Sequence, residues 1–469
     1  MNPHLIRRIV LCCLCAVLVS GQARALTYPT GFNLVQVPDP LAATNPEYPL
    51  DPLPVPSVGQ PFFDHHFGTI LTRATQSFNL RHEYSRFDPF NADQSLIILH
   101  EFLGGDFAAY RTNSFPFDTA ANRVTSLFPL DEPRWDPTDP NTAWGLERDG
   151  FKILKMNVQN GQFSTVKDFA SDSTLGPIIS DHPDLYRITS KNEGESSADK
   201  RYWTLGLQGS DDDYRLQYLF CWDRQLDQVV GVLPLSKDEA ALIDWVGMSP
   251  LGNWVLIGGD SGSGNTAGLT MADRQLTTFH QLAASTAHSD IGLDSQGREV
   301  IVMQNTATDF IDLIPIALDT VPVTDAGGYA ASAIIPLIRL NYAGDTNGFQ
   351  GGVHISCNCS GYCLVSTYTA PDLPEQNWLD RTIVLARLNR SKPAVWYLAK
   401  VHNSTGSYWE ETQATISNNG KKVVWASNWG NGAGSEQVFV MQLDMPPLPG
   451  EPPKIKSKGL PWSILLLGD

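Results

Sequence analysis

The chain has 469 residues and a formal net charge of −17, from 33 basic and 50 acidic side chains. A charge this negative argues against nucleic acid or an anionic membrane as a general partner. It also counts against a polyanionic substrate, unless a local basic or metal-bearing pocket reverses the field. The simplest explanation of the charge is solubility outside the cell.

Residues 1–25 have the pattern of a signal peptide. Arg7 and Arg8 precede an apolar run over residues 9–19, and Ala23-Arg24-Ala25 supplies the small-x-small pattern that a signal peptidase cuts. This run is too short to cross a bilayer, and no other stretch of the sequence is long and apolar enough to do so. We therefore expect a protein without a membrane span that is secreted or periplasmic.

Four cysteines follow the expected cleavage site, namely Cys221, Cys357, Cys359 and Cys363. In an exported protein they are disulfide candidates with three possible pairings. A local bridge from Cys357 or Cys359 to Cys363 is the simplest arrangement. The sequence leaves the pairing open.

The interior of the chain, between residues 60 and 445, has no long linker, charge block or low-complexity tract. Short alternating apolar runs recur between turns rich in Gly, Asn, Asp, Pro and Ser. The best helical pattern, around residues 237–243, is only two turns long. These features predict an all-β protein with many antiparallel strands.

One pattern repeats along this interior: a polar pair, a short strand, a turn with Asp, Asn or Gly, and a strongly apolar strand. The spacing between repeats, roughly 40–65 residues, suits the blade of a β-propeller. The seven units start at His82-Glu83-Tyr84, Glu132-Pro133-Arg134-Trp135, Glu193-Gly194-Glu195, Asp244-Trp245, His288-Ser289-Asp290, His354-Ile355-Ser356 and Glu410-Glu411.

Seven starts predict a seven-bladed β-propeller over residues 61–445. A further strand, residues 68–73, is placed to complete the last blade, whose own strands end near Met441, and so to close the ring. Residues 26–60 are expected to form an extended N-terminal segment, and residues 446–469 a Pro-rich C-terminal tail. The alternative architecture is a pair of β-sandwiches, which does not predict the repeated inner-strand pattern.

Two turns, Ser249-Pro250-Leu251-Gly252 and Ser417-Asn418-Asn419-Gly420, make the chain resemble the TolB-like propeller family. Among enzymes with this repeat, the chain is most similar to oligogalacturonate lyases and other secreted propeller polysaccharide lyases. The resemblance implies a divalent metal, commonly manganese, held by inner-strand histidines and a glutamine. The matching positions are His288, Gln350 and His354, while Ser356 stands where the family has a further histidine.

Inner strands line the axis of a propeller, and alternate side chains on each strand point into it. His82 and Tyr84 therefore share a face, as do Glu132 and Arg134, and His288 and Asp290. Each of these residues alone is more often structural, bonding a neighbouring blade or fixing a turn. Their recurrence at one repeat position predicts a functional site in the central funnel.

A lyase acting on a uronide would use these residues in distinct roles. A divalent ion (manganese, calcium or zinc) on His288, Gln350, His354 and Asp290, with help from Arg134, would neutralise the substrate carboxylate. His82 would then take the proton and Tyr84 would protonate the leaving group. Candidate substrate-binding residues are Trp135, Trp245, Glu411 and Trp429, with Trp409 also suited to sugar stacking.

The sequence is also compatible with two other functions. The funnel could belong to a non-catalytic module that binds glycans or envelope proteins, which needs aromatic and polar lining but no metal or base. A hydrolase could instead use paired carboxylates such as Asp290 and Glu411. Under each reading we expect a monomer whose partner is a polysaccharide or oligosaccharide rather than nucleic acid.

Overall fold

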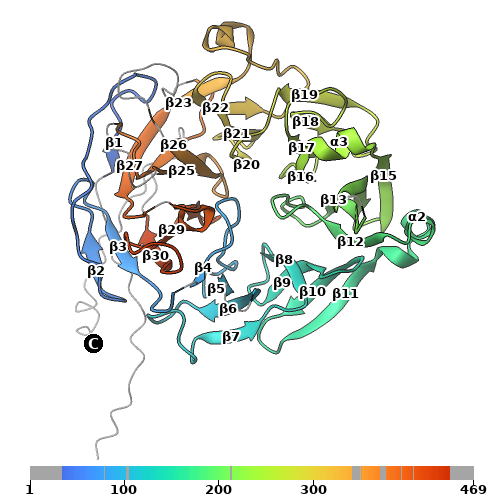
Figure 1. The fold of residues 1–469 in the computed structure, drawn as a ribbon, viewed down its shortest axis with the longest axis horizontal. Helices are drawn as coiled ribbons and strands as arrows, with labels where there is room; N and C mark the ends of the chain where they lie inside the picture. Colours follow the sequence, from blue (N-terminus) through green and yellow to red (C-terminus); the bar gives the residue numbers. More distant parts are fainter. Residues whose placement is uncertain are drawn as a thin grey trace, which may run out of the picture.

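The fold of the chain is a ring of seven antiparallel sheets around a central axis (Figure 1). It is taken from a computed structural model that describes residues 34–443 apart from residues 79, 102–104, 212–213, 341–348, 350, 370–376, 392 and 405. The all-β, seven-bladed β-propeller predicted from the sequence is therefore confirmed. The expected signal peptide and the Pro-rich tail lie outside the described residues.

Each of the first five blades is a four-stranded sheet whose first strand lies nearest the axis (Figure 1). Blade I contains β4 (Leu80–Arg81), β5 (Leu96–Glu101), β6 (Asp106–Arg111) and β7 (Arg123–Ser126). Blade II contains β8 (Leu130–Trp135), β9 (Thr142–Glu147), β10 (Lys152–Asn157) and β11 (Gln162–Asp168). Blade III contains β12 (Leu185–Thr189), β13 (Tyr202–Gly209), β14 (Leu216–Asp223) and β15 (Gln228–Pro234). Blade IV contains β16 (Ile243–Met248), β17 (Val255–Gly259), β18 (Leu269–Ala272) and β19 (Phe279–Ala283).

The remaining blades complete the ring and include strands from the N-terminal segment. Blade V contains β20 (Ser289–Leu293), β21 (Glu299–Asn305), β22 (Phe310–Pro315) and β23 (Ile335–Arg339). Blade VI contains β24 (Gly352–Ser356), β25 (Tyr362–Tyr368), β26 (Thr382–Arg387) and β27 (Ala394–Lys400), with β1 (Val35–Gln36) at its outer edge. Blade VII contains β28 (Thr415–Ile416), β29 (Lys422–Ser427), β30 (Gln437–Gln442), β3 (Ile70–Arg73) and β2 (Pro61–Phe63).

Helices are short and lie between strands. They are α2 (Leu175–Asp181), α3 (Lys237–Leu242) and the 3-10 helices η1 (Phe169–Ser171), η2 (Ala326–Ala331) and η3 (Tyr408–Glu410). A capping box between Ser236 and Glu239 starts α3 where the sequence predicts a two-turn helix. Within the described part of the chain, no helix has the length and apolarity needed to cross a membrane.

The ring is closed by pairing between the two ends of the propeller. Strand β3 runs antiparallel to β30, with Leu71 opposite Met441 and Arg73 opposite Phe439. Strand β30 of the last blade thus gains a partner from the start of the chain, as the sequence predicts. Because β3 covers the edge of β30, the ring has no open strand edge at the point of closure, and a covered edge does not associate with other chains.

The start of blade III differs from the prediction. The sequence places it at Glu193-Gly194-Glu195, whereas the inner strand is β12, which ends at Thr189. The predicted start instead lies in the loop to β13, where the backbone N–H of Met248 donates to the carbonyl of Glu195. Gly194 is required there, since a Cβ at this position would lie 1.7 Å from the carbonyl oxygen of Val246.

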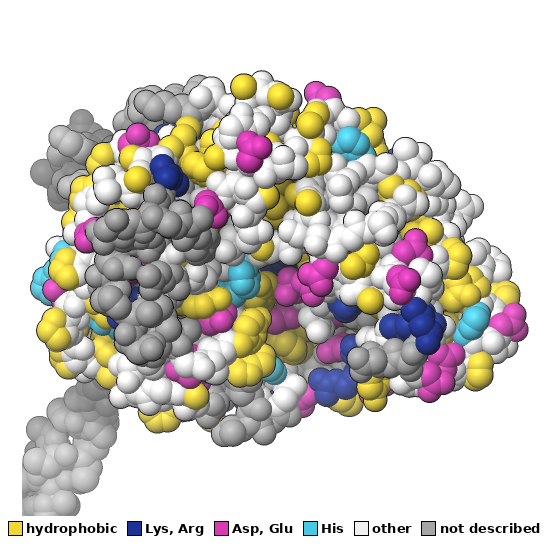
Figure 2. Space-filling model, turned by 45° about the horizontal axis from the view of Figure 1, so that its top comes forward, with side chains coloured by type: hydrophobic (Ala, Val, Ile, Leu, Met, Phe, Trp, Pro, Cys, Tyr) yellow, Lys and Arg dark blue, Asp and Glu magenta, His cyan; other side chains and the backbone are white. Residues whose placement is uncertain are grey.

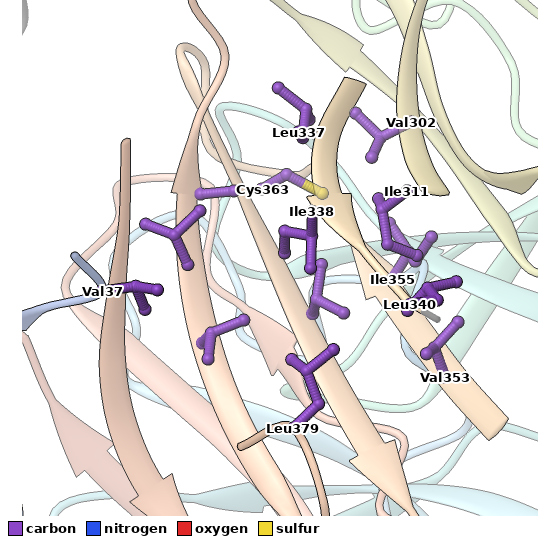
Figure 3. Close-up of a cluster of buried hydrophobic side chains, with 14 of the residues drawn as sticks. Val37, Val302, Ile311, Leu337, Ile338, Leu340, Val353, Ile355, Cys363 and Leu379 are labelled. Carbon is purple, nitrogen blue, oxygen red and sulfur yellow. The ribbon is translucent and has the colours of Figure 1, made fainter. Parts of the chain in front are cut away.

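The hydrophobic core lies between neighbouring blades. Between blades V and VI, Val302 and Ile311 pack against Val353 and Ile355 in one fully buried cluster (Figure 3). Such clusters are apolar because each sheet buries both faces against its neighbours. The packing holds the inner strands in fixed positions and so fixes what they present to the axis.

The four cysteines expected to follow the signal peptide are all buried, and Cys221, Cys357 and Cys363 are free thiols. Cys357 and Cys363 share the cluster between blades V and VI, whereas Cys359 belongs to the cluster between blades VI and VII. The thiols of Cys357 and Cys363 lie within hydrogen-bond distance of each other, and burial raises the pKa of both. This contact favours the local pair over a bridge to Cys221, which lies beside Met248.

Leu71 on the closing strand β3 is 2% exposed and packs in the cluster between blades VI and VII. We expect Leu71→Ala to lower the free energy of unfolding by about 2–4 kcal/mol, because it leaves a cavity at the point of closure. Urea denaturation followed by tryptophan fluorescence measures the change. The matched control is Phe63→Ala on β2, where the side chain is 61% exposed and the change should stay within about 0.5 kcal/mol.

Candidate functional site

The centre of the ring is occupied by residues 82–89, which we call the channel segment. In blade I, Arg81 pairs with His100, and the next pairing is the bridge between Phe90 and Ile97. Residues 82–89 therefore lie between the two pairing points on the inner strand, whereas only residues 98–99 lie between them on β5. The excess chain leaves the sheet and runs through the middle of the ring (Figure 1). Blade I thus fills the channel that the other blades surround.

Arg86 anchors the channel segment to three blades. Its side chain is 3% exposed and donates to the hydroxyl of Ser289 at 2.9 Å. It also donates to the carbonyl of Glu193 at 2.9 Å and forms an ion pair with that carboxylate at 3.3 Å. The guanidinium carbon lies 4.5 Å from the ring centroid of Trp245. A buried cation needs such partners, because removing it from water is costly.

Other residues of the segment bind the remaining blades. On blade II, Arg134 donates to the carboxylate of Glu83 at 2.6 Å and stacks on Phe87. On blade VII, the backbone N–H of Asn418 donates to Asp88 at 2.7 Å. The segment therefore runs along the axis, with Tyr84 toward the end where inner strands begin and Asp88 toward the end where they finish.

Three rings meet where the inner strands begin, at what we call the histidine end of the channel. The hydroxyl of Tyr84 lies 3.4 Å from Nδ1 of His288. The rings of His288 and His354 are in edge contact, with centroids 4.7 Å apart, and those of Tyr84 and His354 are 5.4 Å apart. These side chains come from blades I, V and VI, so only the closed ring assembles them.

Glu411 joins the cluster from the chain that leads into blade VII. Nε2–H of His354 donates to its carboxylate at 2.6 Å, and Tyr368 on β25 both bonds Glu411 and stacks on His354. The carboxylate thus fixes the orientation of the His354 ring. On the face of the molecule in Figure 2, acidic and histidine side chains lie beside the hollow in the middle.

Burial controls the protonation of this cluster. It lowers the pKa of both His288 and His354 to about 3, with the neighbouring imidazole adding to the effect on His288 and Arg81 to that on His354. Burial also raises the pKa of Tyr84 well above its usual range and raises that of Glu411. Near neutral pH the site therefore presents two neutral imidazoles and a protonated phenol.

His82 lies apart from the reactive cluster that the sequence places it in. Its ring is fully buried, and Nε2 bonds the backbone carbonyl of Gln413. Burial and the adjacent Arg81 lower its pKa to about 3. The side chain ties the channel segment to blade VII, and the two-residue alternation with Tyr84 fails because this stretch is not a regular strand.

Two further predicted residues, Arg134 and Asp290, lie away from the histidine cluster. Arg134 is held by Glu83 and lies 3.8 Å from the carboxylate of Glu195. Asp290 is fully buried and accepts the backbone N–H groups of Ile291 and Cys357. Burial raises the pKa of Asp290 to about 8. The two-residue spacing thus does not bring Asp290 to His288.

The predicted sugar-stacking tryptophans are mostly covered. Trp245 is fully buried beneath Arg86, and Trp135 is 8% exposed, with its indole N–H donating to the carbonyl of Pro89. Trp429 stacks on His402 at 4.1 Å and donates to the carbonyl of Leu53 in the N-terminal segment. Their burial leaves little face for a sugar, whereas Trp409 in η3 is 47% exposed.

A divalent metal needs more ligands than this cluster shows. Within the described residues, no group of three or more His, Cys, Asp or Glu side chains is arranged to hold a metal ion. Nδ1 of His354 is buried with no partner there, but its Nε2 is committed to Glu411. The predicted ligand Gln350 lies outside the described residues. The residues that are described therefore do not make a metal site on their own.

Arg81, Arg86 and Tyr368 are central to the site and are not among the residues that the sequence predicts. The guanidinium of Arg81 is fully buried and donates to the side chain of Gln413 and the carbonyl of Trp409. Arg86 reaches partners more than a hundred residues away. In the sequence, the feature that could have indicated these arginines is the density of charged and aromatic residues in Arg81-His82-Glu83-Tyr84-Ser85-Arg86.

Comparisons with known proteins bear on the fold. No protein-family model matches the chain, and no curated protein matches its sequence. A solved oligogalacturonate lyase in complex with manganese superposes with a TM-score of 0.54 at 10% identity, covering 82% of this chain and 96% of that chain. The oligogalacturonate lyase of Vibrio parahaemolyticus gives 0.52 at 8% identity, with the same coverage of 82% and 96%.

These likenesses establish the fold. The WD40 domain of Neurospora crassa Pan2 also matches, with a TM-score of 0.43 at 11% identity over 81% of this chain and 97% of that chain. The distant resemblance to oligogalacturonate lyases expected from the sequence is thus confirmed as a likeness of structure. Identity this low identifies the shared architecture and leaves the activity to the site itself.

Arg86 offers a test of the channel segment. We expect Arg86→Met to lower the free energy of unfolding by about 3 kcal/mol, because it strands the buried Ser289 hydroxyl and leaves the half-buried Glu193 carboxylate without its partner. Chemical denaturation measures the loss. Arg148→Met is the matched control: its ion pair with Asp106 at 3.1 Å is about one-third exposed, and its loss should cost at most about 1 kcal/mol.

The pH dependence of stability tests the buried neutral state of His82. Its pKa of about 3 in the folded protein lies below the unfolded value of about 6.5. Between these values the unfolded chain binds more protons, so this group's contribution to stability falls as the pH falls. His82→Gln keeps a donor for Gln413 but cannot titrate.

The stability gap between wild type and His82→Gln should therefore shrink by about 2 kcal/mol between pH 7.5 and pH 5. Urea denaturation of both proteins across this range measures the gap. Above pH 7 the gap should be constant, which provides the internal control. A gap that stays constant down to pH 5 would show that His82 is not held neutral.

Proposed function

We propose that this protein is a lyase that cleaves uronic-acid-containing oligosaccharides by β-elimination at the histidine end of the channel. The observation that carries the proposal is the meeting of Tyr84, His288 and His354 from three blades, in protonation states suited to acid–base chemistry. The likeness in fold to solved oligogalacturonate lyases supports it.

β-Elimination removes the proton from the carbon next to the uronate carboxyl group. A carbon–carbon double bond then forms as the bond to the glycosidic oxygen breaks, and that oxygen takes up a proton. We assign the base to His288, which is neutral and partly exposed, and the acid to Tyr84, whose hydroxyl lies 3.4 Å from it. At that distance the proton can pass back from His288 to Tyr84 between turnovers.

His354 and Glu411 act on His288 in this scheme as positioning residues. The hydrogen bond between them at 2.6 Å fixes the orientation of the His354 ring. The His288 ring packs against the His354 ring, with centroids 4.7 Å apart, and its orientation is restricted in turn. The role of base moves from His82, as expected from the sequence, to His288. His82 is fully buried and its Nε2 already has a partner.

Two buried guanidinium groups would act on a uronide carboxylate at this end and offset the nearby carboxylates of Glu193 and Glu411. Arg81 lowers the pKa of His354, and Arg86 adds to the effect of burial and His354 on that of His288, so both buried guanidinium groups act here. A local field of this kind favours an anion in a narrow channel. Tyr408 and Trp409, 45% and 47% exposed on the approach to blade VII, offer faces for sugar rings.

A divalent cation bound here would neutralise the charge of the substrate carboxylate. The ligands proposed from the sequence are His288, His354, Gln350 and Asp290, but Asp290 is committed to backbone N–H groups. We therefore assign no step to a metal ion. Manganese, which accompanies one solved lyase, enters the proposal as an addition to be tested.

The wider setting of the protein belongs to the same proposal. An oligosaccharide partner, export by residues 1–25, a secreted or periplasmic location and a monomeric state are all expected from the sequence. Tyr84, His288, His354 and Glu411 all come from this one chain, so the scheme needs no residue of a second chain.

The first test measures release of unsaturated uronide by its ultraviolet absorbance, with oligogalacturonate and other uronides as substrates. His288→Ala and Tyr84→Phe should each lower kcat/KM by about 100-fold or more, because each removes an acid–base group. The matched control is His280→Ala on the outer strand β19, where Nε2 bonds the carbonyl of Thr320. It should retain full activity.

Assays with a chelator and with added manganese separate the metal-dependent form from the metal-free form. Full activity in His288→Ala would rule out the assignment of the base. Binding of uronides by the wild type without turnover, with and without manganese, would instead identify a non-catalytic glycan-binding propeller.

A further inference from the structure

A second cavity opens at the opposite end of the channel, where the inner strands finish. Its volume is about 450 Å³, and it is lined by the turns that follow the inner strands of blades I, II, III, VI and VII. The channel segment separates it from the histidine cluster. A volume of this size lies within the range of small-molecule binding sites, and the lyase proposal makes no use of it.

Lys200 is the unusual residue of this cavity. Its side chain lines the cavity although the residue is only 7% exposed. Within the described chain, its ammonium group has no hydrogen bond or ion pair, and the nearest aromatic ring is that of Trp203, with its centroid 5.8 Å away. Burial lowers the pKa of Lys200. The carboxylates of Glu195 and Asp136 act on this ammonium group from a distance without pairing with it, so it is open to a partner from outside the chain.

The backbone holds Lys200 in position. The residue has a φ of 58°, in the left-handed region that few side chains adopt. Its carbonyl accepts the indole N–H of Trp203 at 3.0 Å and a guanidinium N–H of Arg224 at 2.7 Å. These bonds fix a strained backbone and direct the side chain to the cavity.

The other charged groups around the cavity already have partners. Arg134 is paired with Glu83 and Glu195. Asp136 accepts from Thr138 and from the indole of Trp144, among others. Asp88 accepts two backbone N–H groups, and burial raises its pKa to about 7. Among the charged groups of the cavity, Lys200 is thus the one whose side chain has no direct hydrogen bond or ion pair within the described chain.

We propose that this cavity binds a small hydroxylated monocarboxylate, such as a sugar acid, with its carboxylate on Lys200. Asn418 and Asn419, both exposed in the turn of blade VII, line the cavity and offer polar groups for hydroxyls. Phe90 and Trp135 supply an apolar wall. A monoanion fits better than a dianion, because the nearby carboxylates of Asp136 and Glu195 would repel a second negative charge.

The test uses D-galacturonate as the probe and the full chain. First, Lys200 of the wild type is acylated with an amine-reactive ester, with and without galacturonate, and its modification is measured by mass spectrometry. We expect galacturonate to protect Lys200 and glucose to leave it reactive. Second, calorimetric titration compares wild type with Lys200→Met, which keeps the apolar stem and removes the charge, and the affinity of this site should fall at least tenfold.

Two further variants provide the controls. Lys237→Met, at an exposed lysine of α3, should leave the affinity unchanged, and Asn418→Ala should weaken it by a smaller factor than Lys200→Met. Lys200→Met should fold with an unchanged or higher Tm, since it removes a buried charge. It should also keep any lyase activity, so that the two proposals fail separately.

Three outcomes would overturn the proposal. The first is equal affinity in wild type and Lys200→Met together with no protection of Lys200. The second is protection by glucose as strong as that by galacturonate, which would exclude recognition of the carboxylate. The third is stronger protection by inorganic phosphate, which would exclude a monocarboxylate as the preferred ligand.

Discussion

Arg86 carries a full positive charge in the middle of a sevenfold ring, and a buried guanidinium must be compensated by the protein itself. Its compensation comes from a loop of blade III, the indole of blade IV and a hydroxyl of blade V. Each of these groups stands on a different sheet, so the arginine is stable only when all of them are seated around the axis. The channel segment then lies in place, and the two ends of the channel are separated.

The separation gives each end its own chemistry. At the histidine end, Tyr84 from the channel segment meets two imidazoles that burial keeps neutral. At the other end, Asp88 from the same segment helps to line a cavity that holds an unpaired ammonium. One stretch of irregular chain therefore shapes both sites, while the regular strands supply the frame that holds it.

The propeller could be predicted from the sequence because its signals are local. A polar pair, a turn and an apolar strand follow one another within a few residues, and five of the seven predicted starts overlap or directly adjoin an inner strand. Glu410-Glu411 lies a few residues before β28, and Glu193-Gly194-Glu195 shows the limit of that approach: a polar pair can also belong to a loop that packs on the next blade. The real inner strand, Leu185–Thr189, does not alternate strictly, and the polar pair before it, Asp181-His182, stands at the end of α2.

The site could be predicted in part. Strand alternation places His354 in the channel. Its contacts with His288 and Tyr84 arise because the closed ring brings blades I, V and VI together at the axis. Alternation fails for His82, because residues 82–89 leave the ladder, and for Trp245, because an arginine from another blade covers it. Arg86 and Ser289 are 203 residues apart, and no sequence pattern in either segment predicts their hydrogen bond.

The pairing of β3 with β30 also has a consequence in time. During synthesis Leu71 emerges hundreds of residues before Met441, its partner across the closing ladder. The first strand must therefore wait, unpaired, until the last blade has been made. Contacts so distant in sequence form slowly, and until they form the unfinished ring exposes an open edge. We expect this chain to be exported, and the delay is then an advantage. A ring that cannot close early leaves the chain unfolded enough to cross a membrane until its last blade has been translated.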